Sequence, residues 1–490
     1  MGCDVGSQST KALLLDDRGT TIGRGARAHR TSHPSPGWAE QHPGDWLTGV
    51  RGSIDDAVRS AGAAASDIAA IGIAAQVDGI VAVDAANRSL GPAPIWMDRR
   101  ATAELADATR RISPDEIRAL TGANADPSHG APKIAWLRDH LGERVDAYLL
   151  PATFVVATLT GERAVDAANA SCLLLLDVET GRWSRELLDA FEVDASSLGD
   201  VRPATDVVGL VLGDVAEAWG LPRCPVVVGT GDEHAACLAA GVLQPGLIGD
   251  IVGTAEPVAV GTDRVVRDAD GLVETHAHVP PGRWLVEHPG FVSAGSVRWL
   301  AESVLGCEQS EIGLLAGQAP AGAAGVGFLP ALGGAMTPRW DPSVLGAFTG
   351  LSVGHDRRHL ARAVLEGCCY AVRDVVERLD ALGLGGDTIR VVGGGARDRT
   401  WLQIKADVTR RRIERLEEPE ATALGAALTA AVGIGWFDDL DAASAATLRL
   451  AAEVFEPNPS NASSYADGWA AHRERFAALE SLATPEAVPA

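Results

Sequence analysis

Lysine is nearly absent from this chain. Lys11, Lys133 and Lys405 are the only lysines among 490 residues, and arginine supplies the remaining positive charge. The formal net charge of −23 argues against non-specific binding to nucleic acid or to anionic membranes, because both are polyanions. A P-loop needs Gly-Lys followed by Ser or Thr, and none of the three lysines follows a glycine. That phosphate-binding motif is therefore excluded.

Cysteine motifs and targeting segments are also missing. The seven cysteines never form a Cys-x-x-Cys pair, which disfavours a zinc or disulfide framework and fits a reducing, cytoplasmic compartment. The N-terminus, MGCDVGSQSTKA, has no basic segment followed by an apolar core, so no signal peptide is predicted. It begins three residues before Asp4, so we expect the first strand to be clipped. The apolar segment 421–437 is short and contains glycines, which predicts a buried helix and not a membrane span.

A dinucleotide fingerprint is incomplete. The motif G-x-G-x-x-G lies between a strand and a helix, and the best match is VVGGGARD. It supplies Gly393 and Gly395, but Asp398 stands where the third glycine belongs. A dinucleotide-dependent oxidoreductase is kept as a third hypothesis, which NADH titration would test.

The elements that are present predict an α/β chain in two halves. Each half opens with a strand-turn-strand, CDV-GSQST-KALLL at the start and LIGDIVGTAEPVAV at 247–260. Each also holds a strand, a glycine-rich turn and a helix, at 224–241 and at 389–408. The pattern breaks at VLQPG, so we expect one domain over 1–243 and a second over 244–490.

The first hairpin turn, DVGSQSTK, has the residues of an anion cradle. Gly6 permits an unusual backbone angle, so successive N–H groups can face a phosphate, and Ser7 and Gln8 add donors. Asp4 can hold Mg²⁺ through water, and Lys11 can pair with a phosphate. The alternative is a tight hairpin turn without a ligand.

A similar turn, Gly253-Thr254, opens the second half. A phosphate chain that is held from both sides needs one such turn from each domain. The presence of two turns therefore favours the phosphate-binding interpretation.

Asp232 follows an apolar strand and begins a helix, whose N-terminus favours a carboxylate. As an N-cap it would only stabilise the helix. As a catalytic base it would accept the proton of a substrate hydroxyl that attacks a phosphoryl group. Glu233 is expected to be its solvated neighbour.

Two polar clusters interrupt apolar segments in the first half. Gln76 and Asp78 follow IGIA, and Asp98 and Arg100 follow PIWM, next to Trp96. Such groups suit a polyhydroxylated ligand, although each alone is typical of a surface turn. The segment THAH, at 275–278, has metal-like spacing, but no acidic or histidine pattern completes a site. It is therefore interpreted as part of a strand.

With these residues in place, the chain resembles the FGGY carbohydrate kinases, and most nearly their xylulokinase-like members. The most specific match is FLPALGGAMTPRWDPSVLGAFTGLSVGHDRRHLARAVLEG at 328–367. KIAWLRDH resembles the tail of the family's first signature, although the residues before Lys133 depart from it. GWAEQHPGDW, and VVGGGARDRTWLQIKADV followed by EATALGAALTAAVG, match further family segments. The resemblance covers nearly the whole chain.

The resemblance implies two ribonuclease-H-like domains, of the actin-like ATPase type, with a cleft between them that binds ATP, Mg²⁺ and a sugar. It also implies a cytoplasmic enzyme of carbohydrate metabolism, and a homodimer is a further expectation. By motif, it makes Asp232 the catalytic base and Asp4 the metal-associated acid. Substrate binding falls to Gln76, Val77, Asp78, Asp98 and Arg100, and ATP binding to Ser7, Gln8, Lys11, Gly253, Thr254, Gly394 and Gly395.

Two departures from the family pattern bear on the substrate. Xylulokinases usually have Gln-Met-His-Gly where this chain has Gln76-Val77-Asp78-Gly79, which suggests an acceptor-only hydrogen-bonding pattern at that point. GTA replaces GTS at 253–255, which removes one hydroxyl near the phosphates. D-xylulose, converted to D-xylulose 5-phosphate, is the first expectation. Another ketose or polyol, such as ribulose, ribitol or erythritol, is the alternative, and an actin-like ATPase without a sugar is a hypothesis from another class.

Overall fold

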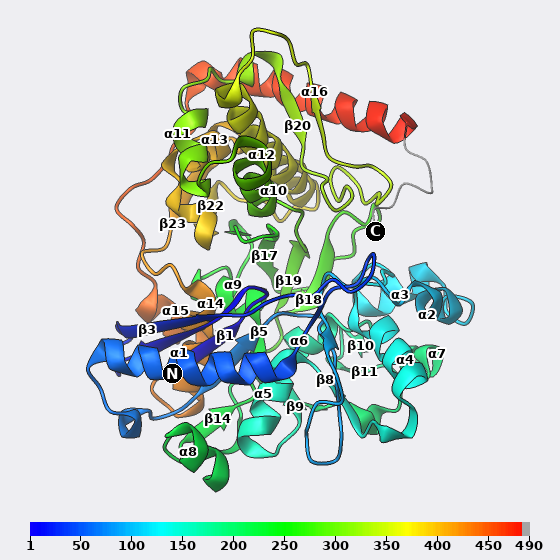
Figure 1. Cartoon of the computed structure of the whole chain (residues 1–490), viewed down its shortest axis with the longest axis vertical. Coiled ribbons are helices and arrows are strands. Elements are labelled where there is room, and N and C mark those ends of the chain that lie inside the picture. Colours follow the sequence, from blue (N-terminus) through cyan, green and yellow to red (C-terminus); the bar gives the residue numbers. More distant parts are fainter. Residues whose placement is uncertain (483–490) are drawn as a thin grey trace.

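The computed structural model describes residues 1–482, which form two lobes (Figure 1). The first lobe is built on a five-stranded sheet. Its three N-terminal strands are antiparallel neighbours, and the other two run parallel to the first strand. In spatial order the strands are β3 (Thr21–Ala28), β2 (Ser9–Leu15), β1 (Gly2–Val5), β5 (Gly72–Ala75) and β15 (Thr230–Gly231).

The second lobe repeats this topology. Its sheet also has three antiparallel strands followed by two parallel ones, with one additional strand at the edge. The spatial order is β18 (Glu274–Ala277), β19 (Trp284–His288), β17 (Val258–Thr262), β16 (Leu247–Ile251), β22 (Thr388–Val392) and β23 (Arg412–Arg415). The repeat confirms the predicted α/β fold with two ribonuclease-H-like domains.

Helix α1 (Pro43–Ala61) covers the outer strands of the first sheet. Proline at its first turn suits a helix start, and Gly62 ends it in the left-handed conformation at φ 63°. The apolar side chains of Trp46, Val50 and Ile54 recur at helical spacing and are buried against the sheet. This face fixes the helix on the strands that carry the first hairpin turn.

The rest of the first lobe is made of short elements. Its other helices are α2 (Thr102–Ala108), α3 (Pro114–Thr121), α4 (Gly130–Leu141), α5 (Pro151–Thr160), α6 (Ala167–Ser171), α7 (Arg185–Phe191), α8 (Gly213–Trp219) and α9 (Asp232–Ala239). The short strands are β4 (Glu40–Gln41), β6 (Val81–Val83), β7 (Ala93–Pro94), β8 (Ala147–Leu149), β9 (Ala164–Val165), β10 (Leu176–Asp177), β11 (Arg182–Trp183), β12 (Asp200–Val201), β13 (Val207–Leu210) and β14 (Pro225–Val227).

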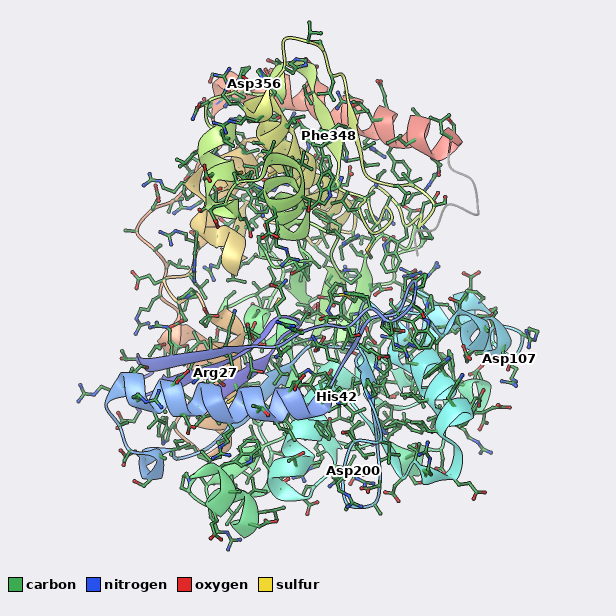
Figure 2. The ribbon with its side chains drawn as sticks, viewed as in Figure 1. Arg27, His42, Asp107, Asp200, Phe348 and Asp356 are labelled. Atoms are coloured by element: carbon green, nitrogen blue, oxygen red, sulfur yellow. The ribbon has the colours of Figure 1, made fainter. Side chains whose placement is uncertain are left out.

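In the second lobe, α12 (Arg357–Ala381) is the central helix of the core. The Asp356 side chain caps its start by accepting the backbone N–H of Arg358. Phe348 packs on Phe328 beside it, and both Phe348 and Asp356 are labelled in the upper lobe in Figure 2. The other elements are α10 (Ala294–Trp299), α11 (Ile312–Ala316), α13 (Arg399–Thr409), α16 (Ala462–Leu482), β20 (Gly327–Leu329) and β21 (Ala347–Thr349).

Two helices that follow the second sheet in the chain pack against the first lobe (Figure 1). Helix α14 (Ala421–Gly433) packs on α9, β1 and β5, and α15 (Leu440–Thr447) packs beside it. The approach is close, because a Cβ on Gly2 would lie 2.0 Å from the Ala423 carbonyl oxygen. The buried helix predicted from the apolar segment is confirmed. The division at 243/244 stays a prediction, since α14 and α15 lie with the first sheet. No helix within residues 1–482 is long and apolar enough to cross a membrane.

Candidate active site

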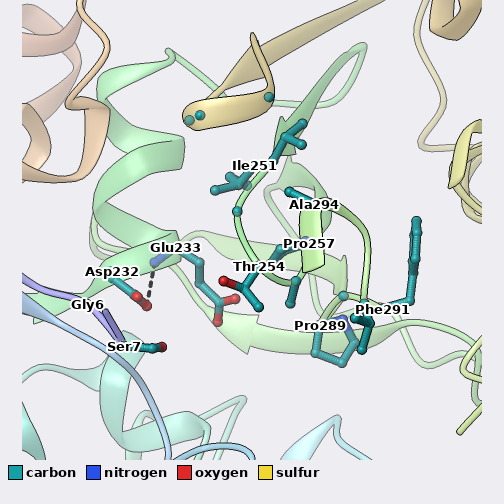
Figure 3. A pocket seen from close by; sticks show the side chains of 18 of the residues that line it. Gly6, Ser7, Asp232, Glu233, Ile251, Thr254, Pro257, Pro289, Phe291 and Ala294 are labelled. Atoms are coloured by element: carbon teal, nitrogen blue, oxygen red, sulfur yellow. Dashed lines mark hydrogen bonds between the residues drawn. The ribbon is translucent and has the colours of Figure 1, made fainter. Parts of the chain in front are cut away.

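A cavity of about 1430 Å³ lies between the two lobes. Both sheets contribute to it, through the turns that follow β1, β5, β16 and β22 and through the start of α9. Figure 3 shows Ser7 and Asp232 from the first lobe together with Thr254 and Phe291 from the second. The predicted residues that line the cavity are Asp4, Ser7, Gln8, Lys11, Gln76, Val77, Asp78, Asp232, Gly253, Thr254, Gly394 and Gly395.

The two predicted phosphate turns meet in this cavity. The Gln8 side-chain amide donates a hydrogen bond to the Thr254 hydroxyl at 2.5 Å. Ser7 is held from behind, because the Trp96 indole N–H donates to its hydroxyl at 2.8 Å and Gln41 donates to its carbonyl oxygen at 2.6 Å. The turns therefore face each other, as a phosphate chain held from both sides requires.

Lys11 lies at the same end of the cavity, where it forms an ion pair with Glu420 at 2.7 Å. The pKa of Lys11 is raised, because Asp4 and Glu420 outweigh its partial burial. The ammonium group is thus charged and paired with Glu420.

Asp4 presents a buried carboxylate to the cavity. Its residue is 7% exposed, and within residues 1–482 its Oδ1 atom has no hydrogen-bond partner. Burial raises the pKa of Asp4 to about 7, Lys11 opposes that rise, and Asp232 adds to it. This carboxylate oxygen lies beside the phosphate turns and has no hydrogen-bond donor. Mg²⁺ binds such oxygens, either directly or through its bound water. The residue therefore fits the predicted metal.

Asp232 is the first residue of α9 and lines the cavity. The N-cap position belongs to Gly231, so the interpretation of Asp232 as an N-cap is wrong. Its Oδ1 atom accepts the backbone N–H of Glu233 at 3.0 Å, and Figure 3 shows its carboxylate beside the turn of Gly6 and Ser7. Burial raises the pKa of Asp232 to about 6. Glu233, expected to be solvated, is instead buried and lines the same cavity.

The glycine turn after β22 packs on the second phosphate turn. Gly393 has φ 90°, and a Cβ on Gly395 would lie 2.2 Å from the Val252 side chain. Only glycine allows this approach. A Cβ on Gly394 would meet nothing within 4 Å, so the backbone there is open to the cavity.

The turn after β5 places Asp78 in the lining of the cavity. One oxygen of its carboxylate accepts the Gly130 N–H at 3.0 Å, and the other lies 3.2 Å from Nδ1 of His129. Both oxygens are therefore engaged, and His129 itself lines the cavity. Asp78 itself only accepts hydrogen bonds here, and the imidazole of His129 beside it adds a donor to this part of the cavity.

Lys133 joins the loops around that turn. Its ammonium group is fully buried and donates to the carbonyl oxygens of Asp78, at 2.9 Å, and Ile95, at 2.8 Å, and also to that of Ser128. Burial lowers the pKa of Lys133 to about 8. One side chain thus fixes three segments of the cavity wall.

Asp98 and Arg100 do not line the cavity among the residues that the structure describes. The Arg100 guanidinium donates to both oxygens of Asp98, pairs with Glu40 at 2.8 Å and lies 3.7 Å from the centroid of the Trp38 ring. The pair is buried behind the wall because its charges satisfy each other. Asp98 and Arg100 therefore have no direct contact with a substrate in this cavity. The neighbouring Arg99 lines the cavity instead.

Sequence reasoning missed four further wall residues. His129 comes from the start of α4, Glu274 and His276 from β18, and Glu287 from β19. The strand interpretation of THAH is confirmed for the residues in β18. Glu274 and His276 are alternate residues of this strand and share a face, which is the sequence signal that could have found them.

Comparison with known proteins agrees with this geometry. The models for the N-terminal and C-terminal domains of the FGGY family of carbohydrate kinases match residues 1–239 and 251–434. The chain is 31% identical to the xylulose kinase of Escherichia coli K12, over 88% of this chain and 89% of that protein. It is also 31% identical to the glycerol kinase of Thermococcus gammatolerans, over 93% of each chain. The crystal structure of xylulose kinase from Rhodospirillum rubrum superposes with a TM-score of 0.85 at 28% identity, covering 98% of this chain and 99% of that one. The chain belongs to the FGGY family of carbohydrate kinases and is an ATP-dependent sugar kinase.

Proposed function

We propose that this enzyme transfers the terminal phosphoryl group of ATP to a terminal hydroxyl of a ketose, with D-xylulose as the first acceptor and D-xylulose 5-phosphate as the product. The observation that carries the proposal is the shared cavity. Asp232, the two facing turns of Gln8 and Thr254, and the polar turn of Gln76 and Asp78 all line it.

In this proposal Asp232 accepts the proton of the attacking hydroxyl. A bond forms between that oxygen and the γ-phosphorus, the bond from phosphorus to the β-γ bridging oxygen breaks, and ADP leaves. A carboxylate is a weak base, but phosphoryl transfer asks mainly for positioning and for a proton acceptor late in the step. With a pKa of about 6, Asp232 is mostly ionised at neutral pH.

The two turns and Asp4 have different roles at the phosphates of ATP. The Thr254 hydroxyl and the Gln8 amide are donors that phosphate oxygens accept, and the N-terminal hairpin approaches from the opposite side. Asp4 is the residue that would hold Mg²⁺, which neutralises phosphate charge when bound. The lobes enclose the acceptor and exclude water, which limits hydrolysis of ATP.

Another ketose or polyol is the main alternative, because glycerol kinases match the chain as well as xylulose kinases do. An actin-like ATPase without a sugar would need no polar wall at Gln76 and His129, which argues for a kinase. The proposal places the enzyme in the cytoplasm, and the homodimer stays a prediction.

A coupled assay of ADP formation tests the proposal. We expect D-xylulose to raise ADP formation by the wild-type enzyme by at least tenfold over ATP alone, with sugar phosphate formed in equal amount. ADP formation that no sugar raises, or that an unfolded peptide raises instead, would favour the ATPase alternative.

A further inference from the structure

Strands β18 and β19 of the second lobe form one wall of the cavity, next to His129 of the first lobe. Glu274 and His276 lie on β18 and Glu287 lies on β19. All three line the same cavity as Gln76 and Asp78, and none is more than 2% exposed. We call these three residues the β18–β19 wall.

The wall and the residues facing it carry polar atoms without partners. Within residues 1–482, both carboxylate oxygens of Glu287, Oε2 of Glu274 and Nδ1 of His276 make no hydrogen bond. Oε1 of Gln76 and Nε2 of His129, from the first lobe, make none either. Buried polar groups are nearly always hydrogen-bonded, and each unpaired one costs free energy. Nε2 of His276 lies 3.5 Å from Oε2 of Glu274 and 3.6 Å from Oε1 of Glu287, so the two carboxylates share one imidazole and keep unused hydrogen-bonding capacity. All six atoms belong to residues that line one cavity, where the polar groups of a ligand can complete their hydrogen bonds.

The charges of the wall define what that ligand must offer. Burial opposes ionisation of Glu274, but His129 and His276 hold its pKa well below the usual value, so it is an acceptor only. Burial raises the pKa of Glu287 to about 7, so this group can accept or donate. The ligand must therefore donate protons from several hydroxyls.

His129 supplies a hydrogen-bond donor beside these acceptors. Its Nδ1 atom lies 2.9 Å from the Cys172 carbonyl oxygen and thus carries a proton. Burial lowers the pKa of His129, but Asp78 and Glu274 outweigh that effect and raise it well above the usual value. Its Nε2 atom is then a donor, which a carbonyl or hydroxyl oxygen of the ligand can accept.

We propose that the β18–β19 wall binds the non-reacting oxygens of the acceptor, so that the enzyme selects an uncharged ketose or polyol of four or more carbons over glycerol and over sugar acids. Glycerol keeps only two hydroxyls after one reacts, so it reaches fewer of these six atoms than a longer acceptor does. A sugar acid would bring its carboxylate among the acidic residues Asp78, Glu233, Glu274 and Glu287, which outnumber the imidazoles of His129 and His276. This inference rests on the proposed function and adds the residues that decide the acceptor.

The wall also closes against the first lobe. The Asn124 backbone N–H donates to Oε1 of Glu274 at 2.7 Å, and Nε2 of His129 lies 3.8 Å from that same oxygen. The acceptor is therefore enclosed by both lobes. Loss of a wall residue should weaken binding of the acceptor and leave binding of ATP unchanged, since the phosphate turns lie elsewhere in the cavity.

Steady-state kinetics of Glu287→Gln and Glu274→Gln test the inference. Both replacements keep the size of the side chain and remove its charge. We expect the KM for D-xylulose to rise at least tenfold in each variant, and the KM for ATP to stay within twofold. Glu302→Gln is the matched control, because Glu302 is an exposed carboxylate of the same lobe outside the cavity. Its two KM values should equal those of the wild type.

A panel of acceptors with the wild-type enzyme tests the size and charge rule. We expect kcat/KM for D-xylulose or a pentitol to exceed that for glycerol at least 100-fold, and gluconate to give no product. Equal kcat/KM for glycerol, efficient use of gluconate, or unchanged KM values in both folded variants would overturn the inference while leaving the kinase assignment intact. If a variant fails to fold, as circular dichroism would show, the panel decides. Transfer to no acceptor at all would overturn the proposed function and this inference together.

Discussion

Gln8 and Thr254 form a hydrogen bond of 2.5 Å across the cleft although 246 residues separate them in the chain. Each residue sits in the turn that follows the first strand of its sheet, between β1 and β2 in one lobe and between β16 and β17 in the other. The internal repeat of the fold thus brings two equivalent turns face to face. A phosphate chain that enters between them finds donors on both sides.

Replacing Thr254 with valine should weaken ATP binding by about tenfold. The change keeps the shape of the side chain and removes one hydrogen-bond donor, and a bond to a charged phosphate contributes about 1.5–3 kcal/mol. Calorimetric titration with ATP measures the Kd. Thr180→Val, at an exposed turn of the first lobe, should leave it unchanged. Equal Kd values for Thr254→Val and the wild type would remove Thr254 from the phosphate site.

The acid limb of the pH profile should report Asp232. Its pKa is raised to about 6 by burial, and only the ionised form can take a proton from the acceptor. At saturating Mg²⁺, ATP and acceptor, kcat should therefore fall about tenfold for each pH unit below 6, and saturation with the acceptor limits the contribution of Glu287, whose pKa is about 7. Saturation with Mg²⁺ keeps Asp4, whose pKa is about 7, from contributing to the same limb. A rate that is flat from pH 7 to pH 5 would contradict the role of Asp232 as base.

Lys133→Met should destabilise the first lobe and disturb the cavity wall at Asp78. The variant leaves three buried carbonyl oxygens without their shared donor, and each loss costs about 1–3 kcal/mol. We expect a lower melting temperature and a higher KM for the acceptor, measured by calorimetry and by kinetics. Arg51→Met removes an exposed cation from α1 and should change neither. An unchanged melting temperature in Lys133→Met would show that these contacts are dispensable.

Lys405 holds the residues on either side of the second phosphate turn, Gly253-Thr254. It pairs with Asp250 and Glu256, which flank that turn, and all three side chains are buried. Lys405→Met leaves two buried carboxylates without a counter-charge, which costs about 3–5 kcal/mol.

The loss in Lys405→Met should be larger at pH 8 than at pH 5. Burial and the neighbouring Glu256 raise the pKa of Asp250 well above its usual value, even against the attraction of Lys405. A group whose folded-state pKa is raised binds its proton more tightly when folded, so stability increases as the pH falls through that pKa. Melting temperatures of variant and wild type across this range measure the effect, with Arg185→Met as an exposed control. A pH-independent difference would contradict the explanation.

The phosphate turns and Asp232 could be predicted from the sequence because their chemistry is local. A strand, a glycine turn and hydroxyl or acidic side chains within a few residues already define the backbone and the donors. The same reasoning placed Asp98 and Arg100 at the sugar, whereas the structure pairs Arg100 with both Asp98 and Glu40. Spacing along the chain does not reveal that two neighbouring charges satisfy each other.

The β18–β19 wall could not be predicted for a different reason. Glu274 and Glu287 lie on adjacent strands, and His129 reaches them from the other lobe. Their proximity depends on how the two lobes pack, which no local pattern encodes. The replacement of histidine by Asp78 in the family motif was visible in the sequence, but its partner His129 was not.

The proton acceptor is the central claim, and phosphoryl transfer by Asp232→Asn tests it most directly. The variant keeps the size of the side chain and removes the charge, so ATP should bind with the wild-type Kd. ³¹P NMR of wild-type enzyme with ATP, Mg²⁺ and D-xylulose should show a sugar phosphate forming together with ADP, and Asp232→Asn should form it about 10²–10⁴-fold more slowly. Asp115→Asn, at an exposed position of α3, should match the wild type. Transfer by Asp232→Asn at the wild-type rate would contradict the account.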